Sequence, residues 1–131
     1  MRMQGKIGLV TAAGSGMGKA GAIRFAREGA SVSVVDINPE AVDAVVKEIK
    51  DAGGNAIGIV ADLTKDEESK RIVTETANHF EGLDFVWNHV GYPGPASIEG
   101  IEMKDFELTL DLNLRTILVT TEAALSEFRI R

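Results

Sequence analysis

The sequence contains no cysteine, and only 5% of its 131 residues are aromatic. Without cysteine the chain cannot form a disulfide scaffold, a cysteine-ligated zinc site or a thiol nucleophile. Basic residues are also in the minority, because 14 Lys and Arg stand against 20 Asp and Glu, which gives a net charge of −6. That charge argues against a nucleic acid or an anionic membrane as the main partner. No apolar run approaches the roughly 20 residues of a membrane span.

What remains is an ordinary globular composition, with 44% hydrophobic and 26% charged residues. A chain of this length can bury roughly two-thirds of its unfolded surface, which is enough for one core. The apolar stretch after Lys6 is interrupted by Gly8 and is too short for the core of a signal peptide. We therefore expect a single domain over residues 1–131, located in the cytoplasm.

Short apolar runs alternate with segments of helical period from the beginning of the chain. The predicted strands are Lys6–Thr11, Ser31–Asp36, Asn55–Ala61 and Leu83–Asn88. The predicted helices run from Gly16 to Glu28, from Pro39 to Ala52, from Thr64 to Phe80, from Met103 to Leu112 and from Leu114 to Phe128. The last two helical segments meet at Asn113.

Several helix ends carry recognisable signals. Gly29 stands where a left-handed residue would end the first helix, and Asn38 followed by Pro39 supplies an N-cap and a first-turn proline for the second. Thr64-x-x-Glu67 has the form of a capping box and predicts that Thr64 caps the third helix.

Four strands separated by helices predict a parallel sheet, because parallel strands need crossover connections. We expect a Rossmann-type, doubly wound α/β fold with strand order 3-2-1-4, the first two helices on one face and the later ones on the other. A complete fold of this type has two more strands. The sequence therefore predicts an incomplete domain, truncated at its C-terminal side.

The segment from Thr11 to Gly18 joins the first strand to the first helix and is rich in glycine. Backbone N–H groups at a helix N-terminus can hold a pyrophosphate where side chains do not block its approach. Gly16-x-Gly18-x-x-Gly21 formally matches the dinucleotide fingerprint, although the turn before it is longer than the standard one. The alternative is a glycine-rich turn without a ligand.

Asp36 ends the second strand 18 residues after Gly18, close to the spacing at which a carboxylate reaches the adenosine ribose. Neither Ser15 nor Ile37 is a lysine or arginine that could hold a 2′-phosphate. A carboxylate at this point would repel that phosphate, so the sequence predicts NAD rather than NADP. The alternative is an Asx turn leading into Asn38-Pro39.

Together these residues resemble the N-terminal half of a short-chain dehydrogenase/reductase. The family motif Thr-Gly-x-x-x-Gly-x-Gly corresponds to Thr11–Gly18, and the adenine-side aspartate corresponds to Asp62, followed by Leu63. The family's Asn-Asn-Ala-Gly corresponds to Asn88–Gly91, and its active-site asparagine to Asn113. The resemblance spans essentially the whole chain, with its motifs in the family's order.

The resemblance implies an NAD-dependent oxidoreductase that transfers a hydride between the nicotinamide and an alcohol or carbonyl substrate. It implies that the pyrophosphate turn comprises Thr11, Ala12, Ser15, Gly16, Met17 and Gly18. It places Asp36 at the adenosine ribose, Asp62 and Leu63 at the adenine, Asn88 and Gly91 near the nicotinamide ribose, and Asn113 in the proton relay. No metal site is expected, since His79 and His89 have no ligand spacing.

The chain departs from the family in three places. Ala12 replaces the first glycine of the motif, and we expect Gly14 to supply the flexibility of the turn. His89 and Val90 replace Asn and Ala, which predicts local repacking near the nicotinamide. The family's catalytic Ser and Tyr-x-x-x-Lys are absent, and the one tyrosine, Tyr92, has no lysine at the required spacing. We therefore expect no turnover from residues 1–131 alone.

Two other functions are compatible with parts of the pattern. A non-catalytic nucleotide-binding or assembly module would use the same residues, and a methyltransferase also has glycines after its first strand, although Asn88, Gly91 and Asn113 argue against it. The fourth strand would lie at a sheet edge, beside a final helix whose apolar side comprises Ile117, Leu118, Leu125 and Phe128. An open edge and an exposed apolar face predict a homo-oligomer.

Overall fold

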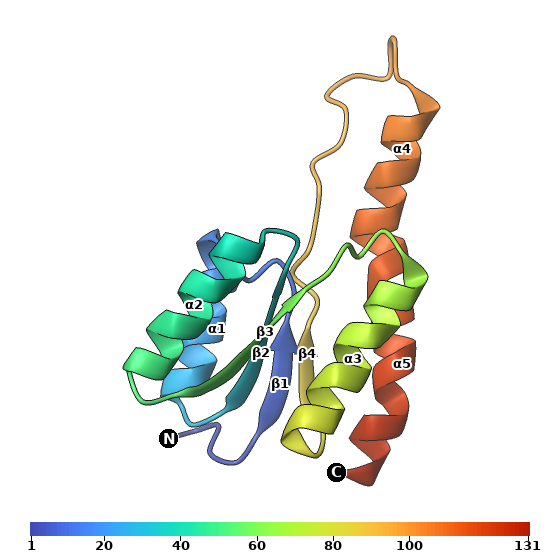
Figure 1. Ribbon diagram of the computed structural model, residues 1–131. Coiled ribbons are helices and arrows are strands. Elements are labelled where there is room, and N and C mark those ends of the chain that lie inside the picture. The colour runs from blue at the N-terminus through green and yellow to red at the C-terminus, as the bar shows by residue number, and fades with distance from the viewer.

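Strands and helices alternate along the chain in the computed structural model, which describes residues 1–131 (Figure 1). The elements are β1 (Ile7–Val10), α1 (Gly16–Arg27), β2 (Ser31–Asp36), α2 (Pro39–Asp51), β3 (Asn55–Val60), α3 (Asp66–Phe80), β4 (Phe85–Trp87), α4 (Met103–Leu110), the π-helical turn η1 (Asp111–Arg115) and α5 (Thr116–Ile130). None of these helices has both the length and the apolar character needed to cross a bilayer.

The four strands form one parallel sheet in the order β3-β2-β1-β4. Ile7 in β1 is in register with Ser31 in β2, and Gly8 is in register with Phe85 in β4. The predicted strand order is therefore confirmed, with β4 at one edge. β4 is shorter than the predicted strand, because only Phe85–Trp87 pairs with β1.

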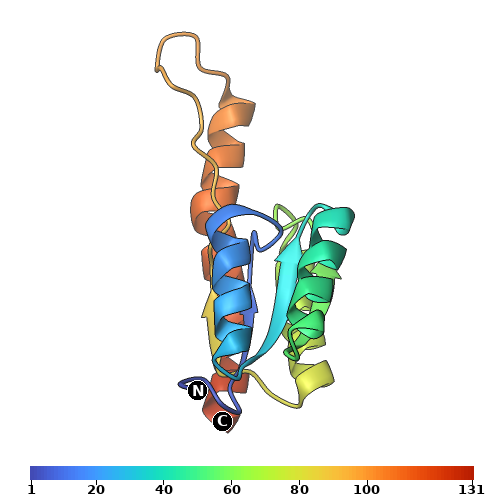
Figure 2. The same ribbon diagram turned by 90° about the vertical axis from the view of Figure 1, so that its left-hand side faces the viewer.

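Helices cover both faces of the sheet, as predicted (Figures 1 and 2). Under α1 and α2 the core contains small and β-branched side chains: Val10, Ala13, Ala22, Ala26, Ala30, Val32, Val34, Val45, Ile49 and Ala56. Under α3 and α5 it contains Leu9, Val35, Ile59, Ala61, Leu63, Ile72, Val73, Leu83 and Ala124. β1 and β2 contribute to both cores, since their side chains alternate between the two faces.

Two of the predicted helix ends are confirmed and one is wrong. Gly29 has φ +97°, and the Asn38 side chain accepts a hydrogen bond from the Ala41 N–H at 3.1 Å. Thr64 does not cap α3, which begins two residues later with Lys65 at the N-cap position. The Thr64 hydroxyl instead donates to the Asp62 carboxylate at 2.6 Å, so it is not available to the helix.

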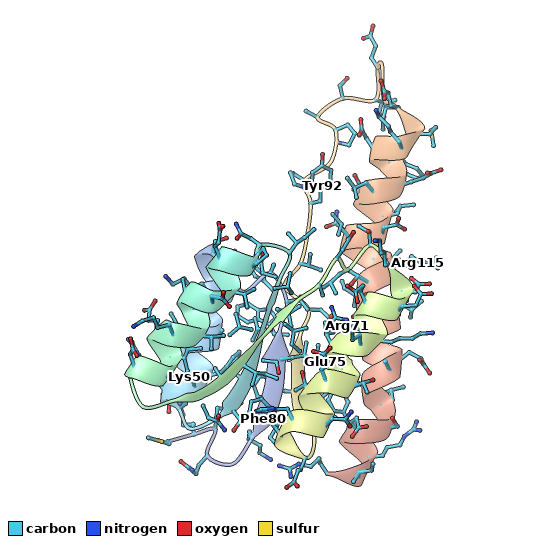
Figure 3. All side chains as sticks on the ribbon, viewed as in Figure 1. Lys50, Arg71, Glu75, Phe80, Tyr92 and Arg115 are labelled. Atoms are coloured by element: carbon cyan, nitrogen blue, oxygen red, sulfur yellow. The ribbon has the colours of Figure 1, made fainter.

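The last two helical segments form one rod that continues through η1, whereas the sequence predicted two helices meeting at Asn113. Leu110 and Thr116, which flank η1, both have right-handed helical backbone angles. No glycine or proline lies between Met103 and Ile130, so nothing ends the helix there. Arg115 also ties the rod to α3 through two hydrogen bonds to Asp66, at 2.9 and 2.6 Å (Figure 3). α4 projects beyond the sheet and buries no residue (Figure 2).

Aromatic side chains on one face of β4 pack against α1. The Phe25 ring lies 4.9 Å from the Phe85 ring and 6.0 Å from the Trp87 ring, measured between centroids. A Cβ on Gly8 would overlap Phe85, and a Cβ on Gly21 would overlap Trp87. The third glycine of the fingerprint is therefore required for close packing of α1 on β4.

The two ends of the chain meet at Asp84, just before β4. Its carboxylate accepts from the Ile7 N–H at 2.8 Å and from the Arg131 guanidinium at 3.1 and 2.9 Å. Arg131 also donates to the Gly5 carbonyl at 3.1 Å. The hydrogen bonds from Arg131 and Ile7 hold the pKa of Asp84 below its usual value of 3.8, so the folded state favours the charged form.

We predict that Asp84→Asn lowers the free energy of unfolding by about 1–2 kcal/mol at neutral pH, because it removes charge-assisted hydrogen bonds. A carboxyl whose pKa is lowered by folding stabilises the protein above its unfolded pKa and loses this contribution as the pH falls through its folded pKa. The difference between the parent and the variant should therefore shrink below about pH 4. Urea titrations between pH 7 and 3 measure the difference in the free energy of unfolding. Asp43→Asn, on the exposed face of α2, is the control. A difference that is constant over this range would contradict the assignment.

Candidate functional site

A cleft of about 480 Å³ lies at the carboxyl ends of the strands. Its lining comes from the segments that follow β1, β2, β3 and β4 and from the rod: Ala12, Asp36, Ile37, Ala61, Asp62, Leu63, Thr64, Val90, Leu108 and Leu112. Open parallel sheets bind ligands at this edge, and the volume is in the usual range of small-molecule sites. Ala12, Asp36, Asp62 and Leu63 were predicted as site residues.

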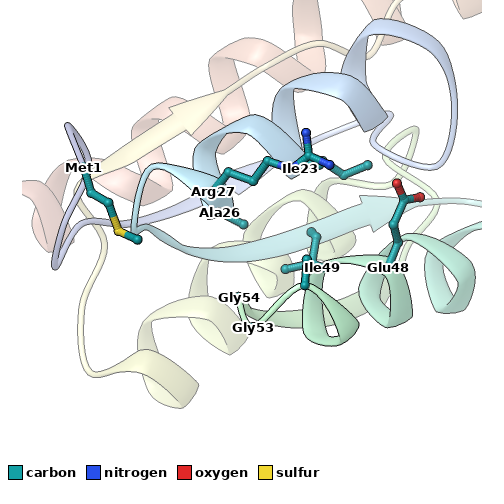
Figure 4. A pocket seen from close by; sticks show the side chains of 9 residues that line it. Met1, Ile23, Ala26, Arg27, Glu48, Ile49, Gly53 and Gly54 are labelled. Atoms are coloured by element: carbon teal, nitrogen blue, oxygen red, sulfur yellow. The ribbon is translucent and has the colours of Figure 1, made fainter.

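A second, smaller groove of about 170 Å³ lies at the opposite edge of the sheet, between the last turns of α1 and α2 (Figure 4). Arg27 and Glu48 are its charged lining residues, and Ile23 and Ile49 are among the apolar ones. It contains none of the predicted site residues. The candidate site is therefore the larger cleft.

The turn between β1 and α1 presents the N-terminus of α1 without a side-chain cap. Ser15 occupies the N-cap position, but its hydroxyl makes no capping hydrogen bond. Gly16 has φ +56°, and a Cβ built on it would meet open space, so the side of this turn is unobstructed. The free N–H groups and the positive end of the helix dipole make this end of α1 suitable for an anion such as a pyrophosphate.

Gly18 has a different role, because it allows the turn to close. A Cβ on Gly18 would overlap the carbonyl oxygen of Ala12. Any side chain at this position would force α1 away from the end of β1. Gly16, the first glycine of the fingerprint, thus keeps the surface of the turn open, and Gly18, the second, allows the turn to close tightly.

The expectation that Gly14 supplies the flexibility of the turn is wrong. Gly14 does not have a positive φ, whereas Ala12 has φ +52°. The Gly14 N–H donates to Asp36 Oδ2 at 2.9 Å, and a Cβ on Gly14 would lie 2.8 Å from that oxygen. Gly14 is therefore needed for close approach to Asp36, and Ala12 itself adopts the left-handed conformation that favours glycine.

Asp36 lies at the mouth of the cleft and is held by the backbone. Oδ2 accepts from Gly14, and Oδ1 accepts from the Asn38 N–H at 3.1 Å, which forms the Asx turn considered as an alternative. Each carboxylate oxygen can accept a second hydrogen bond. The Asx turn therefore orients Asp36 and leaves it able to accept from a ligand's hydroxyl groups.

Asp62 and Leu63 follow β3 on the other side of the cleft. Asp62 Oδ1 accepts from the Thr64 hydroxyl at 2.6 Å and from the Thr64 N–H at 3.1 Å. These hydrogen bonds from Thr64 hold the pKa of Asp62 below its usual value of 3.8. Asp62 is thus a fixed carboxylate at neutral pH, and its Oδ2 has no partner within the protein.

Thr11 joins the glycine turn to the segment that follows β4. It is fully buried, and its hydroxyl oxygen accepts from the N–H groups of His89 at 2.9 Å and Val90 at 3.0 Å. Asn88 donates from Nδ2 to the Thr121 hydroxyl at 3.2 Å, while its Oδ1 is buried without a partner. Thr11 therefore supports the site from beneath it, and Asn88 retains an acceptor.

Asn113 connects η1 to the loop after β4. Its Oδ1 accepts from the Tyr92 N–H at 2.8 Å, and its Nδ2 donates to the Tyr92 carbonyl at 2.6 Å. A Cβ on Gly91 would lie 3.2 Å from Asn113 Oδ1, so Gly91 lets the asparagine approach. Asn113 thus holds the path of the loop with its whole amide, and its role in a proton relay stays a prediction.

The sequence did not identify the apolar half of the cleft. Val90, Leu108 and Leu112 line it, together with Ile37 and Ala61. The sequence places Leu108 and Leu112 in a predicted helix, and no local signal distinguishes them from leucines that pack in a core. Their role depends on the rod extending past the carboxyl ends of the strands, which is a feature of the tertiary structure (Figure 1).

Comparison with known proteins finds one matching family. The family described as short chain dehydrogenase matches residues 6–131. An uncharacterized oxidoreductase from Thermotoga maritima is 36% identical over 129 residues, which cover 98% of this chain and 51% of that protein. The 7alpha-hydroxysteroid dehydrogenase of Escherichia coli K12 is 37% identical over 114 residues, which cover 87% of this chain and 44% of that protein.

Solved structures give the same result. A short chain dehydrogenase from Burkholderia cenocepacia J2315 in complex with NADP is 34% identical, has a TM-score of 0.93, and covers 97% of this chain and 52% of its own. A 7alpha-hydroxysteroid dehydrogenase complexed with NADH and 7-oxo glycochenodeoxycholic acid is also 34% identical with a TM-score of 0.93, with coverages of 96% and 49%. The chain spans about half the length of these relatives.

We predict that Ala12→Gly raises the free energy of unfolding by about 0.5–1 kcal/mol. Glycine relieves the left-handed strain of about 1 kcal/mol or more, and its greater freedom in the unfolded chain offsets part of that gain. Ala13→Gly is the matched control, because Ala13 is fully buried and has no positive φ. It should destabilise the protein. Thermal and urea unfolding of both variants provide the measurement, and a destabilised Ala12→Gly would contradict the strain argument.

Proposed function

Because this chain belongs to the short-chain dehydrogenase family, we propose that residues 1–131 are the dinucleotide-binding part of an oxidoreductase acting on an alcohol or carbonyl group. The observation that carries the proposal is that two oriented carboxylates, Asp36 and Asp62, share one cleft with Ala12, which belongs to the turn that leads to the uncapped N-terminus of α1. A nicotinamide cofactor bound there supplies or accepts the hydride.

The residues of the site divide the binding task between its two ends. The N–H groups of Ser15, Gly16, Met17 and Gly18 would hold the pyrophosphate, with Thr11 and Ala12 shaping the turn. Asp36 would accept from the ribose hydroxyls, and Asp62 would accept from the adenine amino group. Leu63, Val90, Leu108 and Leu112 provide apolar surface for the adenine ring.

The nicotinamide end would lie near Asn88 and Gly91, with Asn113 beside them. The Oδ1 of Asn88 is buried without a partner in the protein, so it is an acceptor for an ordered water molecule and is not exposed to a ligand. A buried carbonyl oxygen without a partner costs about 1–3 kcal/mol, which such a water molecule would offset.

We propose NAD rather than NADP as the cofactor. One structural neighbour is described with NADP and another with NADH, so the choice depends on this chain's own residues. Asp36 faces the cleft, and the side chains at Ser15 and Ile37 carry no positive charge. A fixed carboxylate accepts from two ribose hydroxyls and repels a 2′-phosphate.

Asp36→Ala should weaken NADH binding by about 10-fold and leave NADPH binding unchanged or stronger. The parent chain should bind NADH at least about 10-fold more tightly than NADPH. Calorimetric titration with both cofactors measures the two ratios, and Asp43→Ala on α2 controls for a general loss of charge. Equal affinities in the parent chain would overturn the proposed selectivity.

Residues 1–131 contain one tyrosine and no Tyr-x-x-x-Lys sequence. A general acid or base for the substrate oxygen would typically contribute about 10²–10⁴ in rate. We therefore propose that this part of the protein binds the cofactor without turning over substrate by itself. A non-catalytic nucleotide-binding module would behave in the same way. A measurable cofactor-dependent rate from residues 1–131 would overturn this proposal and would also exclude such a module.

We also propose self-association through the rod. The exposed apolar side chains along it include Met103, Phe106, Leu110, Leu114, Ile117, Leu118 and Leu125, of which Leu118 is 70% exposed. Phe128 differs from the prediction, because it packs against the core under α3 and α5. A continuous apolar surface of this kind favours an interface.

Leu114→Glu with Leu118→Glu should convert a dimer or larger assembly into a monomer at low micromolar concentration, because it buries charge in the proposed interface. Sedimentation velocity gives the state of each form. Lys50→Glu is a suitable control, because it changes a charge on α2, on the far side of the sheet (Figure 3). A parent chain that sediments as a monomer would overturn the proposal.

A further inference from the structure

The side chains of β4 and the residues after it alternate between the two faces of the sheet. Phe85 and Trp87 pack on the α1 side, whereas Val86 and Val90 pack on the α3 and α5 side. His89 continues the first set, because its ring stacks on Trp87 with 4.9 Å between centroids and a 32° angle between planes. His89 therefore faces α1, on the opposite side from the apolar lining at Val90.

The position of His89 is fixed at three points. Its N–H lies 2.9 Å from the Thr11 hydroxyl oxygen and 3.0 Å from the Trp87 carbonyl. Its ring lies against the first turn of α1, since a Cβ on Gly18 would be 2.8 Å from His89 Cδ2. Trp87 is itself confined by Gly21 and by Phe25. The imidazole is thus a positioned group beside the anion-binding end of α1.

Neither ring nitrogen of His89 makes a hydrogen bond within the protein. The residue is half-buried. A neutral imidazole carries one N–H donor and one acceptor nitrogen. A donor oriented by packing costs little to order when a ligand binds. The site therefore contains a hydrogen-bonding side chain next to Gly18, at a position where the family motif has asparagine.

We propose that His89 is a cofactor-contacting residue, whose imidazole N–H donates to an oxygen of the pyrophosphate or of the ribose next to the nicotinamide, with Trp87 as the platform that orients it. The inference depends on the proposed function, because it assigns one more residue to the same site. It also gives Trp87 a role that packing alone does not explain, since it places an aromatic face under the imidazole.

Three truncated cofactors distinguish the possible contacts. ADP-ribose contains the pyrophosphate and both riboses, ADP contains the two phosphates and one ribose, and AMP lacks the pyrophosphate. His89→Ala should weaken the binding of NADH and of ADP-ribose about 3- to 10-fold, which is the effect of one net hydrogen bond. It should leave the binding of AMP unchanged. Equal weakening of ADP would assign the contact to the pyrophosphate, and unchanged ADP binding would assign it to the second ribose.

Two variants and two spectroscopic measurements separate this contact from a packing effect. His89→Asn keeps a donor and should recover part of the lost affinity. His79→Ala removes the only other histidine, which is exposed on α3, and should have no effect. The ring NMR signals of His89, but not those of His79, should shift when ADP-ribose is added to the parent chain, and Trp87, the single tryptophan, should transfer energy to bound NADH.

The results distinguish the two levels of proposal. If the parent chain binds neither NADH nor AMP, both the proposed function and this inference fail. If the parent binds NADH, but His89→Ala binds NADH and ADP-ribose as well as the parent does and the His89 signals do not shift, then only this inference is overturned.

Discussion

The close approach of α1 to the end of β1 determines where every other part of the site lies. The carbonyl of Ala12 contacts Gly18 where any side chain would intrude, so the first turn of α1 follows directly on the strand. This contact directs the N-terminus of α1 toward the cleft. It also leaves the imidazole of His89 in contact with Gly18. A larger residue at this position would disturb the turn, the helix and the segment after β4 together.

A second constraint is that most of the buried hydroxyl groups under α3 and α5 form hydrogen bonds with one another. Thr76 donates to the Ser33 hydroxyl at 2.8 Å, and Ser69 and Thr116 have their hydroxyl oxygens 3.3 Å apart. These pairs allow small side chains to be buried where two helices meet the sheet. The Thr120 hydroxyl in the same region is buried without a partner, and so is the side-chain oxygen Oδ1 of Asn88. The part of this face that includes Asn88 and Thr120 is therefore less completely hydrogen-bonded than the rest.

The strand order and the layers could be predicted because alternating apolar and helical patterns leave few ways to cover a parallel sheet. The errors arose where a local signal competed with a tertiary contact. Thr64 has the sequence of a helix cap, but Asp62 takes its hydroxyl. Asn113 marks a junction between two helical patterns, but the rod passes through it as a π-helical turn. Ala12 adopts a glycine-like conformation because the contact with Gly18 fixes the turn, whatever residue stands there.

The candidate site shows the same division between local and distant information. Asp36 and the glycines lie within one strand-turn-helix unit and the strand that follows it, so spacing along the chain identifies them. Leu108 and Leu112 reach the cleft only because the rod extends past the carboxyl ends of the strands (Figure 1). Asn113 and Arg115 tie that rod to the loop after β4 and to α3. His89 and Trp87 look like departures from a motif in the sequence. In the fold they form one stacked unit, because alternation along β4 and the residues after it places both rings next to Gly18 and Gly21 of α1.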